Sequence, residues 1–289
     1  MEIDHKVYRI ELKHTFGISR SKNEWYDILF IYIIDGSIVG RGEVAPSARY
    51  NETIQKIIPI IKSSILLPNT SYTISIGELN EIGSKLEDAE SYSILKVKLG
   101  TPKMDKEIII EIRRHTDKLI RVDANEGWAK DDALEMSFWL ADRNVEFIEQ
   151  PFPAKDLNAS IELKKKSPLE IFADENSLSS NDIKPIRHAF HGINIKLMKC
   201  GSLDEGKKMI NIARENGLKV MLGCMVETSV GITNASHLAG EVDFVDLDGN
   251  LLIKNDPYSG VIVNDGRLVL PKCGGSGVTL NSDYSNTLR

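Results

Sequence analysis

The sequence predicts an α/β fold: a (β/α)8-type barrel preceded by a smaller α+β domain. Two observations support this prediction. Between residues 72 and 247, short apolar stretches rich in β-branched residues alternate with amphipathic helical stretches, as in parallel strands joined by helices. Before that region, apolar and polar residues alternate with a period of two, which is typical of half-buried strands.

The first 70 residues have the pattern of antiparallel strands followed by one helix. Tyr8, Ile10 and Leu12 alternate with charged residues, and the apolar run at residues 28–34 is followed by Asp35-Gly36, a strong hairpin signal. Isoleucines at positions 54, 57, 58 and 61 then recur with helical spacing. We therefore expect residues 1–70 to form a small α+β domain.

Residues 71–255 are expected to form the barrel. The predicted strands span residues 72–76, 94–98, 119–123, 146–149, 170–173, 193–197, 218–222 and 243–247. Helical stretches such as 105–116, 131–142, 203–215 and 228–239 lie between them, with short connections. Residues 256–289 form a C-terminal segment with an expected hairpin around Asn264-Asp265-Gly266. A return of this segment to the first domain is one alternative.

Five charged residues recur at the ends of the predicted strands, with the period of one strand-plus-helix unit. They are Lys98, Asp123, Glu149, Asp174 and Lys196, separated by 25, 26, 25 and 22 residues. The carboxyl ends of barrel strands converge on one face, where such barrels carry out their chemistry. The alternative is that these are solvated charges whose even spacing is accidental. Five charged residues with the same spacing, each at the end of an apolar stretch, favour a functional site.

The chemistry of these residues suits proton transfer at a metal centre. Three carboxylates make an all-oxygen site of the kind that Mg²⁺ accepts. Lys96 and Lys98 are two residues apart on a strand and therefore point to the same face, whereas Lys196 approaches from the far side. Neighbouring cations and partial burial are expected to lower a lysine pKa toward working pH, as a base requires. One lysine on each face permits inversion of a carbon.

Five motifs resemble the enolase superfamily, muconate lactonising subgroup. They are Lys96-Val97-Lys98, Asp123-Ala124-Asn125-Glu126-Gly127-Trp128, Ile148-Glu149-Gln150-Pro151, Ala173-Asp174-Glu175 and Ile195-Lys196-Leu197-Met198-Lys199. The resemblance implies one Mg²⁺ per chain held by Asp123, Glu149 and Asp174. It also implies Lys98 and Lys196 as the acid/base pair, with Lys96 assisting at the substrate carboxylate, and a capping role for the first domain.

The segment Asp246-Leu247-Asp248 resembles the dipeptide epimerases of that superfamily, in which it binds the free ammonium group of the substrate. The stretch Leu222-Gly223-Cys224-Met225-Val226-Glu227-Thr228 also looks like theirs, which implies substrate binding by Cys224, Met225 and Val226. Arg20 is a candidate for binding an acidic side chain, with a solvated loop cation as the alternative. The expected function is a Mg²⁺-dependent, two-lysine 1,1-proton transfer through an enediolate. It would invert the α-carbon of the C-terminal residue of a dipeptide, L-Ala-L-Glu or similar.

Three other functions stay open on the sequence. One is o-succinylbenzoate synthase or muconate cycloisomerase activity, whose substrates lack an ammonium group. Another is a lyase that forms a Schiff base at Lys196, and the third is a non-catalytic binding protein.

The sequence departs from the family pattern at three places. The segment between Ile61 and Tyr72 is short, so the first domain is shortened. Glu126 replaces a common glutamine, and Asn176 replaces a common serine.

Composition favours a small-molecule partner. The chain has 289 residues, 42% hydrophobic residues, a net charge of -6 and a pI of about 5.6. Nucleic-acid binders usually carry a basic surplus, so no nucleic-acid partner is expected. The longest apolar run is too short to span a bilayer, and the three cysteines form no C-x-x-C pair. We expect a cytoplasmic protein without a membrane partner, and the sequence leaves homo-oligomerisation open.

Overall fold

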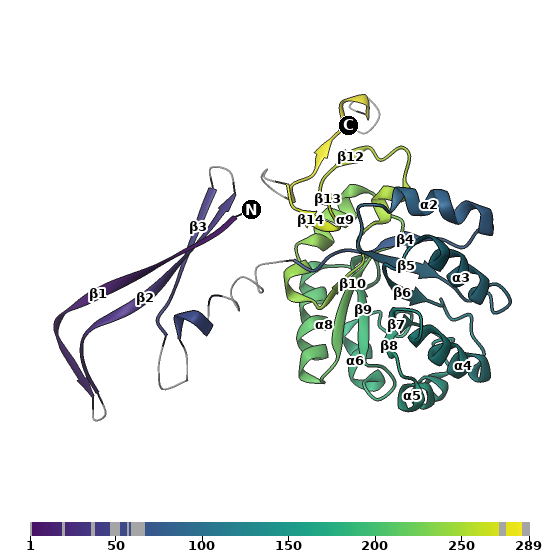
Figure 1. The fold of residues 1–289 in the computed structure, drawn as a ribbon, viewed down its shortest axis with the longest axis horizontal. Coiled ribbons are helices and arrows are strands. Elements are labelled where there is room, and N and C mark those ends of the chain that lie inside the picture. Colours follow the sequence, from purple (N-terminus) through teal and green to yellow (C-terminus); the bar gives the residue numbers. More distant parts are fainter. Residues whose placement is uncertain are drawn as a thin grey trace. The chain divides into compact units, whose positions relative to one another are not determined.

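The computed structural model describes residues 2–18, 21–35, 38–46, 53–56, 58, 67–271 and 276–284. The chain divides into two compact units, Met1–Leu66 and Leu67–Arg289, and each is described by itself (Figure 1). Among the described residues, no helix combines the length and the apolar character that a membrane crossing requires.

The first unit contains a three-stranded antiparallel sheet. Strands β1 (Glu2–Ile18), β2 (Ser21–Asp35) and β3 (Ile38–Val44) pair in the order β1-β2-β3. Ile28 and Leu29 on β2 are buried, and Asp35 pairs with Ile38, as the hairpin prediction requires. The turn residue Gly36 itself lies outside the described residues. Residues 54–56 and 58 are helical, in the segment where helical spacing was noted.

The second unit is built on an eight-stranded parallel sheet in which sequential strands are neighbours. Its strands are β4 (Tyr72–Ile74), β5 (Ile94–Lys98), β6 (Leu119–Asp123), β7 (Val145–Glu149), β8 (Glu170–Ala173), β9 (Gly192–Lys196), β10 (Lys219–Gly223) and β11 (Phe244–Val245). A parallel bridge between Thr70 and Val245 joins the two ends of the sheet. The predicted barrel is therefore confirmed.

The last strand is shorter than predicted. The amide of Asp246 still donates to the carbonyl of Leu222, but the amide of Leu247 donates to the Oγ1 atom of Thr70 at 2.8 Å. A side-chain acceptor thus replaces the next backbone partner, and the ladder ends two residues before the predicted boundary.

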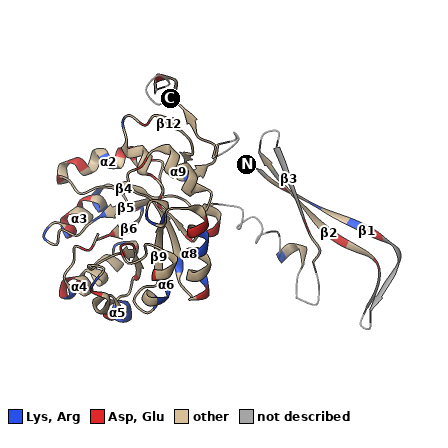
Figure 2. Cartoon of the chain, turned by 180° about the vertical axis from the view of Figure 1, so that it is seen from behind, with Lys and Arg blue, Asp and Glu red and all other residues tan. Residues whose placement is uncertain are grey.

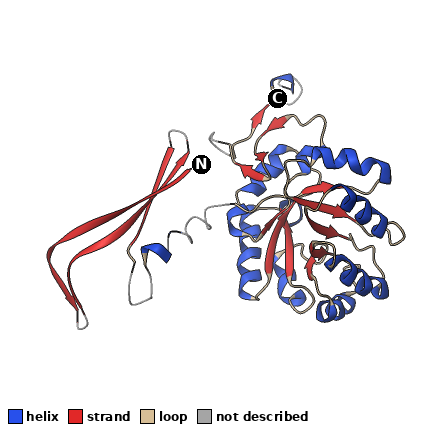
Figure 3. Ribbon diagram, in the orientation of Figure 1, coloured by secondary structure: helices blue, strands red, loops and turns tan. Residues whose placement is uncertain are grey.

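Helices cover the outer face of the sheet (Figure 3). They are α2 (Ile82–Asp88), α3 (Asp105–His115), α4 (Lys130–Ala141), α5 (Leu157–Lys166), α6 (Ser180–Ile186), α7 (Leu197–Cys200), α8 (Leu203–Glu215) and α9 (Ser229–Ser236). Both signs of charge occur on α3, α4, α5 and α8 (Figure 2). Their apolar faces pack inward; in α3 these are Ile108, Ile109 and Ile112.

Local sequence explains where several helices begin and end. The side chain of Ser202 caps α8 by accepting from the amide of Glu205. Ser179 and Asp182 form a capping box at the start of α6. Helix α3 has acidic residues in its first turn and basic residues in its last turn, as the helix dipole favours.

An aromatic layer fills the barrel interior below the carboxyl ends of the strands. Phe147 and Phe172 stack with ring centroids 4.3 Å apart, Phe244 packs against both, and the Arg121 guanidinium lies over Phe147 and Phe244. An acidic residue stands two positions after each of these four residues. Because side chains two residues apart share a face of a strand, these acids form the next layer toward the carboxyl ends of the strands. The packed floor therefore positions the polar site at the carboxyl ends of the strands.

Two short two-stranded antiparallel sheets lie in the C-terminal part of the second unit. Strands β13 (Ile262–Asn264) and β14 (Arg267–Val269) pair directly, and the intervening Asp265 and Gly266 both have positive φ angles, which suits a tight turn. This confirms the hairpin predicted there. Strand β12 (Tyr258–Ser259) pairs with β15 (Thr279–Leu280).

Candidate metal centre and active site

The three predicted metal ligands lie together in the barrel mouth. One carboxylate oxygen from each of Asp123, Glu149 and Asp174 lies within 4.8 Å of the others, and the three residues are at most 3% exposed. They end β6 and β7 and follow β8, three adjacent strands. Three buried carboxylates are a hard oxygen donor set that fits a divalent cation such as Mg²⁺, and without cations they would repel one another.

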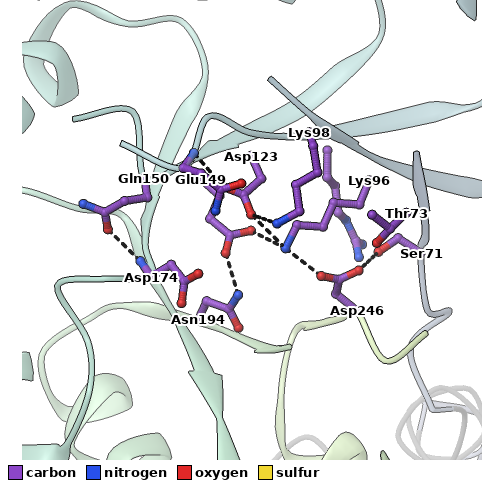
Figure 4. Close-up of polar contacts among 12 residues, drawn as sticks. Ser71, Thr73, Lys96, Lys98, Asp123, Glu149, Gln150, Asp174, Asn194 and Asp246 are labelled. Atoms are coloured by element: carbon purple, nitrogen blue, oxygen red, sulfur yellow. Dashed lines mark hydrogen bonds and ion pairs between the residues drawn. The ribbon is translucent and has the colours of Figure 1, made fainter. Parts of the chain in front are cut away.

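Lysine ammonium groups balance this negative charge. The Nζ atom of Lys96 lies 2.8 Å from Glu149 Oε2, 3.3 Å from Asp123 Oδ2 and 2.7 Å from Asp246 Oδ2, as Figure 4 shows. Lys98 donates to Asp123 Oδ2 at 2.7 Å. Lys196 donates to Asp174 Oδ2 at 2.6 Å.

The two predicted acid/base lysines come from opposite sides of the ligand-bearing strands. Lys98 ends β5 and Lys196 ends β9, and the three strands that position the carboxylates lie between β5 and β9 in the sheet. Lys98 is partly exposed, whereas Lys196 is buried. A molecule bound at the carboxylates would therefore have one amine on each flank.

The carboxylates and lysines of the site shift one another's pKa values in opposite directions. Burial and the neighbouring charge of Asp123 raise the pKa of Glu149 to about 7. Burial also acts to raise the pKa of Asp174, but Lys199 and Lys196 outweigh it and hold that pKa below its ordinary value. Burial acts to lower the pKa of Lys196, but Asp174 and Glu149 raise it above its ordinary value. The expectation of a lowered pKa is thus wrong for Lys196, because its acidic neighbours outweigh burial.

The acid pair that follows β11 is buried and bound to the beginning of the barrel. Asp246 accepts hydrogen bonds from Ser71 Oγ at 2.7 Å and from Lys96 Nζ at 2.7 Å. Asp248 accepts from the amide of Thr73 at 2.5 Å and from its hydroxyl at 3.2 Å. Burial and the charge of Asp246 raise the pKa of Asp248 to about 7, whereas Lys96 and Ser71 hold the pKa of Asp246 below its ordinary value despite burial.

The remaining predicted substrate-binding residues differ in their exposure. Cys224 directs its thiol at the carbonyl of Asp246, 3.3 Å away, and burial raises its pKa. Met225 and Val226, in the loop after β10, are 44% and 67% exposed. Arg20 lies outside the described residues, as do residues 61–66 of the segment predicted to be short.

The structure gives contacts at the site to two residues for which the sequence analysis predicted no role. Asn194 donates its Nδ2 to Glu149 Oε1 at 2.6 Å. Lys199 donates to Asp174 Oδ1 at 2.5 Å and to two backbone carbonyls. A signal for Asn194 was available in the sequence, because it stands two residues before Lys196 on the same strand and must share its face.

The loops after the ligand-bearing strands are tied together by side chains. Gln150 accepts from the amide of Asp174 at 2.8 Å and donates to Asn176 at 2.7 Å. Glu126 accepts from the amide of Ala154, and Asn176 donates to the carbonyl of Ala154 at 2.9 Å. The two residues that depart from the family pattern, Glu126 and Asn176, thus bind the backbone N–H and the backbone C=O of the same residue, Ala154.

The backbone directly after the ligands adopts unusual conformations. Asn125, Glu126 and Gln150 have φ angles of 42°, 67° and 37°, in the left-handed region that non-glycine residues seldom occupy. Such conformations persist where the surrounding structure over-determines them and cluster at functional sites. Here the amide of Glu126 donates to the carbonyl of Gln150, so the two strained segments support each other.

Comparison with known proteins places this barrel in an established family. The family model "Enolase C-terminal domain-like" matches residues 81–284. An L-Ala-D/L-amino acid epimerase of Flavobacterium johnsoniae is 33% identical over 337 aligned positions, covering 97% of this chain and all of that protein. An L-Ala-D/L-Glu epimerase of Bacteroides thetaiotaomicron is 45% identical over 213 residues, covering 73% of this chain and 55% of that protein.

Solved structures agree with the sequence comparison. The dipeptide epimerase of Enterococcus faecalis, complexed with Mg and L-Leu-L-Tyr, superposes with a TM-score of 0.68 at 26% identity, covering 96% of this chain and 98% of that chain. The Bacillus subtilis L-Ala-D/L-Glu epimerase has the same fold, with a TM-score of 0.69 at 22% identity, covering 96% and 98%. From the family match, the relatives and the site geometry together, this chain is a member of the enolase superfamily.

Proposed function

We propose that this protein is a Mg²⁺-dependent dipeptide epimerase. The observation that carries the proposal is the buried triad of Asp123, Glu149 and Asp174, with Lys98 on one flanking strand and Lys196 on the other. A buried acid pair, Asp246 and Asp248, at a third point of the mouth supports a substrate that carries an ammonium group as well as a carboxylate.

The three acids would hold the Mg²⁺. When bound, the cation would neutralise the substrate carboxylate and the charge that develops beside it as the α-proton leaves. Lys96 lies among Asp123, Glu149 and Asp246 with its side chain 3% exposed, so its ammonium adds a fixed positive charge beside the site of the substrate carboxylate.

The two flanking lysines would move the proton. One neutral amine removes the α-proton of the C-terminal residue from one face, and the other ammonium donates a proton to the opposite face, which inverts the carbon. Lys196 donates a hydrogen bond to Asp174 Oδ2. The loss of that contact on metal binding would remove one cause of its raised pKa and favour the neutral amine.

The acid pair would fix the other end of the dipeptide. Asp248 is buried and contacts only uncharged groups of Thr73 among its described hydrogen-bond partners, so an ammonium group would supply the counter-charge that this carboxylate lacks. A carboxylate at the metal and an ammonium at the acid pair define a dipeptide, with L-Ala-L-Glu or a similar peptide as the proposed substrate.

Exchange of the α-proton in deuterated water tests the proposal. The protein with Mg²⁺ is incubated with a dipeptide library, and mass spectrometry records deuterium uptake. We expect uptake at the C-terminal residue together with formation of the second epimer. Turnover of an o-succinylbenzoate synthase substrate without exchange in any dipeptide would overturn the assignment. Trapping of a substrate adduct on Lys196 by borohydride would instead identify a Schiff-base enzyme.

A further inference from the structure

Asn194 is a buried amide at the centre of the candidate metal site. It lies on β9, is 0% exposed, and donates its Nδ2 to Glu149 Oε1 at 2.6 Å (Figure 4). Lys196 lies two residues later on the same strand and therefore on the same face. One strand thus supplies both a predicted proton-transfer group and a hydrogen bond to a predicted ligand.

In two of the three ligand carboxylates, one oxygen accepts from an uncharged amide and the other faces a lysine of the site. The amides are the backbone N–H of Asn125, which donates to Asp123 Oδ1 at 3.0 Å, and the side chain of Asn194, which donates to Glu149 Oε1. Asp123 Oδ2 and Glu149 Oε2 face Lys96 or Lys98. A cation can replace an ammonium group at an oxygen, whereas the two amides stay in place.

We propose that Asn194 is a positioning residue that orients Glu149 for the cation. Because the amide holds Oε1, Oε2 stays available as a ligand atom. The Glu149 carboxylate is also already ordered, so Mg²⁺ binding does not have to restrict its rotation. Hydrogen bonds to ligating carboxylates are known to set metal affinity in this way. The inference rests on the metal site of the proposed function but not on the dipeptide chemistry.

The amide itself is confined by a glycine on the next strand. A Cβ atom at Gly223 would lie 2.5 Å from Asn194 Oδ1 and 2.7 Å from Nδ2, so only glycine leaves room for the side chain. Within the described part of the chain, Oδ1 is buried without a hydrogen-bond partner. Rotating the amide by 180° would place Oδ1 against the negatively charged Glu149 carboxylate. Repulsion between these oxygens therefore keeps Nδ2 on Glu149 and leaves Oδ1 without a hydrogen bond.

Mg²⁺ affinity of Asn194→Leu, measured by titration calorimetry without substrate, is the first test. Leucine keeps the approximate volume and removes the donor, and we expect the dissociation constant to rise about 10- to 100-fold. Asn216→Leu is the matched control, because Asn216 donates its Nδ2 to the carbonyl of Ile212 at 2.7 Å just before β10 begins, at the opposite end of the strands. It should leave the Mg²⁺ affinity unchanged.

Gly223→Ala gives a second test that deletes no hydrogen-bonding group. The new Cβ must displace the Asn194 amide, so the Mg²⁺ affinity should fall in the same direction. Gly206→Ala on helix α8 is its control, because the atom nearest to a Cβ there is the far end of the flexible Leu238 side chain, at 2.8 Å. If Asn194→Leu does not fold, Gly223→Ala decides the question.

Wild-type Mg²⁺ affinity in folded Asn194→Leu or in Gly223→Ala would overturn the inference. The melting temperature in chelator separates a general loss of stability from a change at the metal site. Should the wild-type protein bind Mg²⁺ but exchange no dipeptide proton, the proposed function fails, while the affinities of these variants still decide the role of Asn194.

Discussion

Lys196 and Asp174 form a buried ion pair in which Nζ donates to Oδ2 at 2.6 Å, and both side chains are 4% exposed. The pair joins a predicted base to a predicted metal ligand across adjacent strands β8 and β9. A cation at Asp174 and a protonated Lys196 compete for the same oxygen. Metal binding at Asp174 and the protonation state of Lys196 are therefore linked.

Replacing either flanking lysine should stop epimerisation. We expect Lys98→Ala and Lys196→Ala each to lower the rate at least 10²- to 10⁴-fold, the range of general acid–base contributions. We expect one of the two variants to continue deuterium uptake from a single enantiomer, since the remaining amine still serves one face. Chiral chromatography and mass spectrometry of the products measure both effects.

A lysine outside the site provides the control for this pair. Lys164 on α5 donates to the carbonyl of Phe190 at 2.5 Å and contacts no residue of the triad in the described hydrogen-bond network, so Lys164→Ala should keep the wild-type rate. Full racemising activity in both site variants would refute the two-base assignment.

Mg²⁺ should stabilise the folded protein through Glu149. A ligand that binds only the native state stabilises it in proportion to the logarithm of its concentration, by about 2.7 kcal/mol at 100 times the dissociation constant. We expect the wild-type melting temperature to rise with added Mg²⁺ and to fall back with chelator. Glu149→Gln keeps the shape but removes the charge, so most of the rise should disappear, as measured by differential scanning calorimetry.

The buried carboxyl of Asp248 should destabilise the protein at alkaline pH. Its folded pKa of about 7 lies above the unfolded value of about 3.9, so the folded state binds the extra proton. The stability associated with this group is present below the unfolded value and is lost as pH rises through about 7. Asp248→Asn mimics the protonated form, and its gain in melting temperature in chelator should be larger at pH 8 than at pH 4.5.

The same substitution should remove activity, because an amide cannot neutralise a substrate ammonium. Stability and function would thus change in opposite directions at one position. An Asp248→Asn variant with no extra gain in melting temperature at pH 8, relative to pH 4.5, would contradict the assigned pKa shift.

Trp128 should stabilise the loop beside Lys98 through Asp105. The buried carboxylate of Asp105 accepts from Trp128 Nε1 at 2.7 Å and from the amides of Gly100 and Thr101 at 3.1 and 2.9 Å. Trp128→Phe removes one donor from a buried charged acceptor, and we expect a loss of about 1–3 kcal/mol in the free energy of unfolding. Denaturant titration measures it, and Trp139→Phe on the partly buried face of α4 is the control.

Much of the barrel could be predicted because its signals are local. Apolar strands alternate with amphipathic helices, and Asp123, Glu149 and Lys196 stand at the observed ends of β6, β7 and β9. A strand end is encoded by a few consecutive residues, and parallel strands bring their ends together whatever the details of packing. Asp174, one residue past β8, follows the same rule.

The sequence by itself determined the barrel, the order of its strands and the acids and lysines at their carboxyl ends, because these depend on short-range periodicity. Only the tertiary structure decided which groups contact each other. Lys96 reaches Asp246 across 150 positions of the chain, and Asn194 reaches Glu149 across 45. Such contacts depend on the closure and register of the sheet, and these in turn arise from the packing of all its strands together.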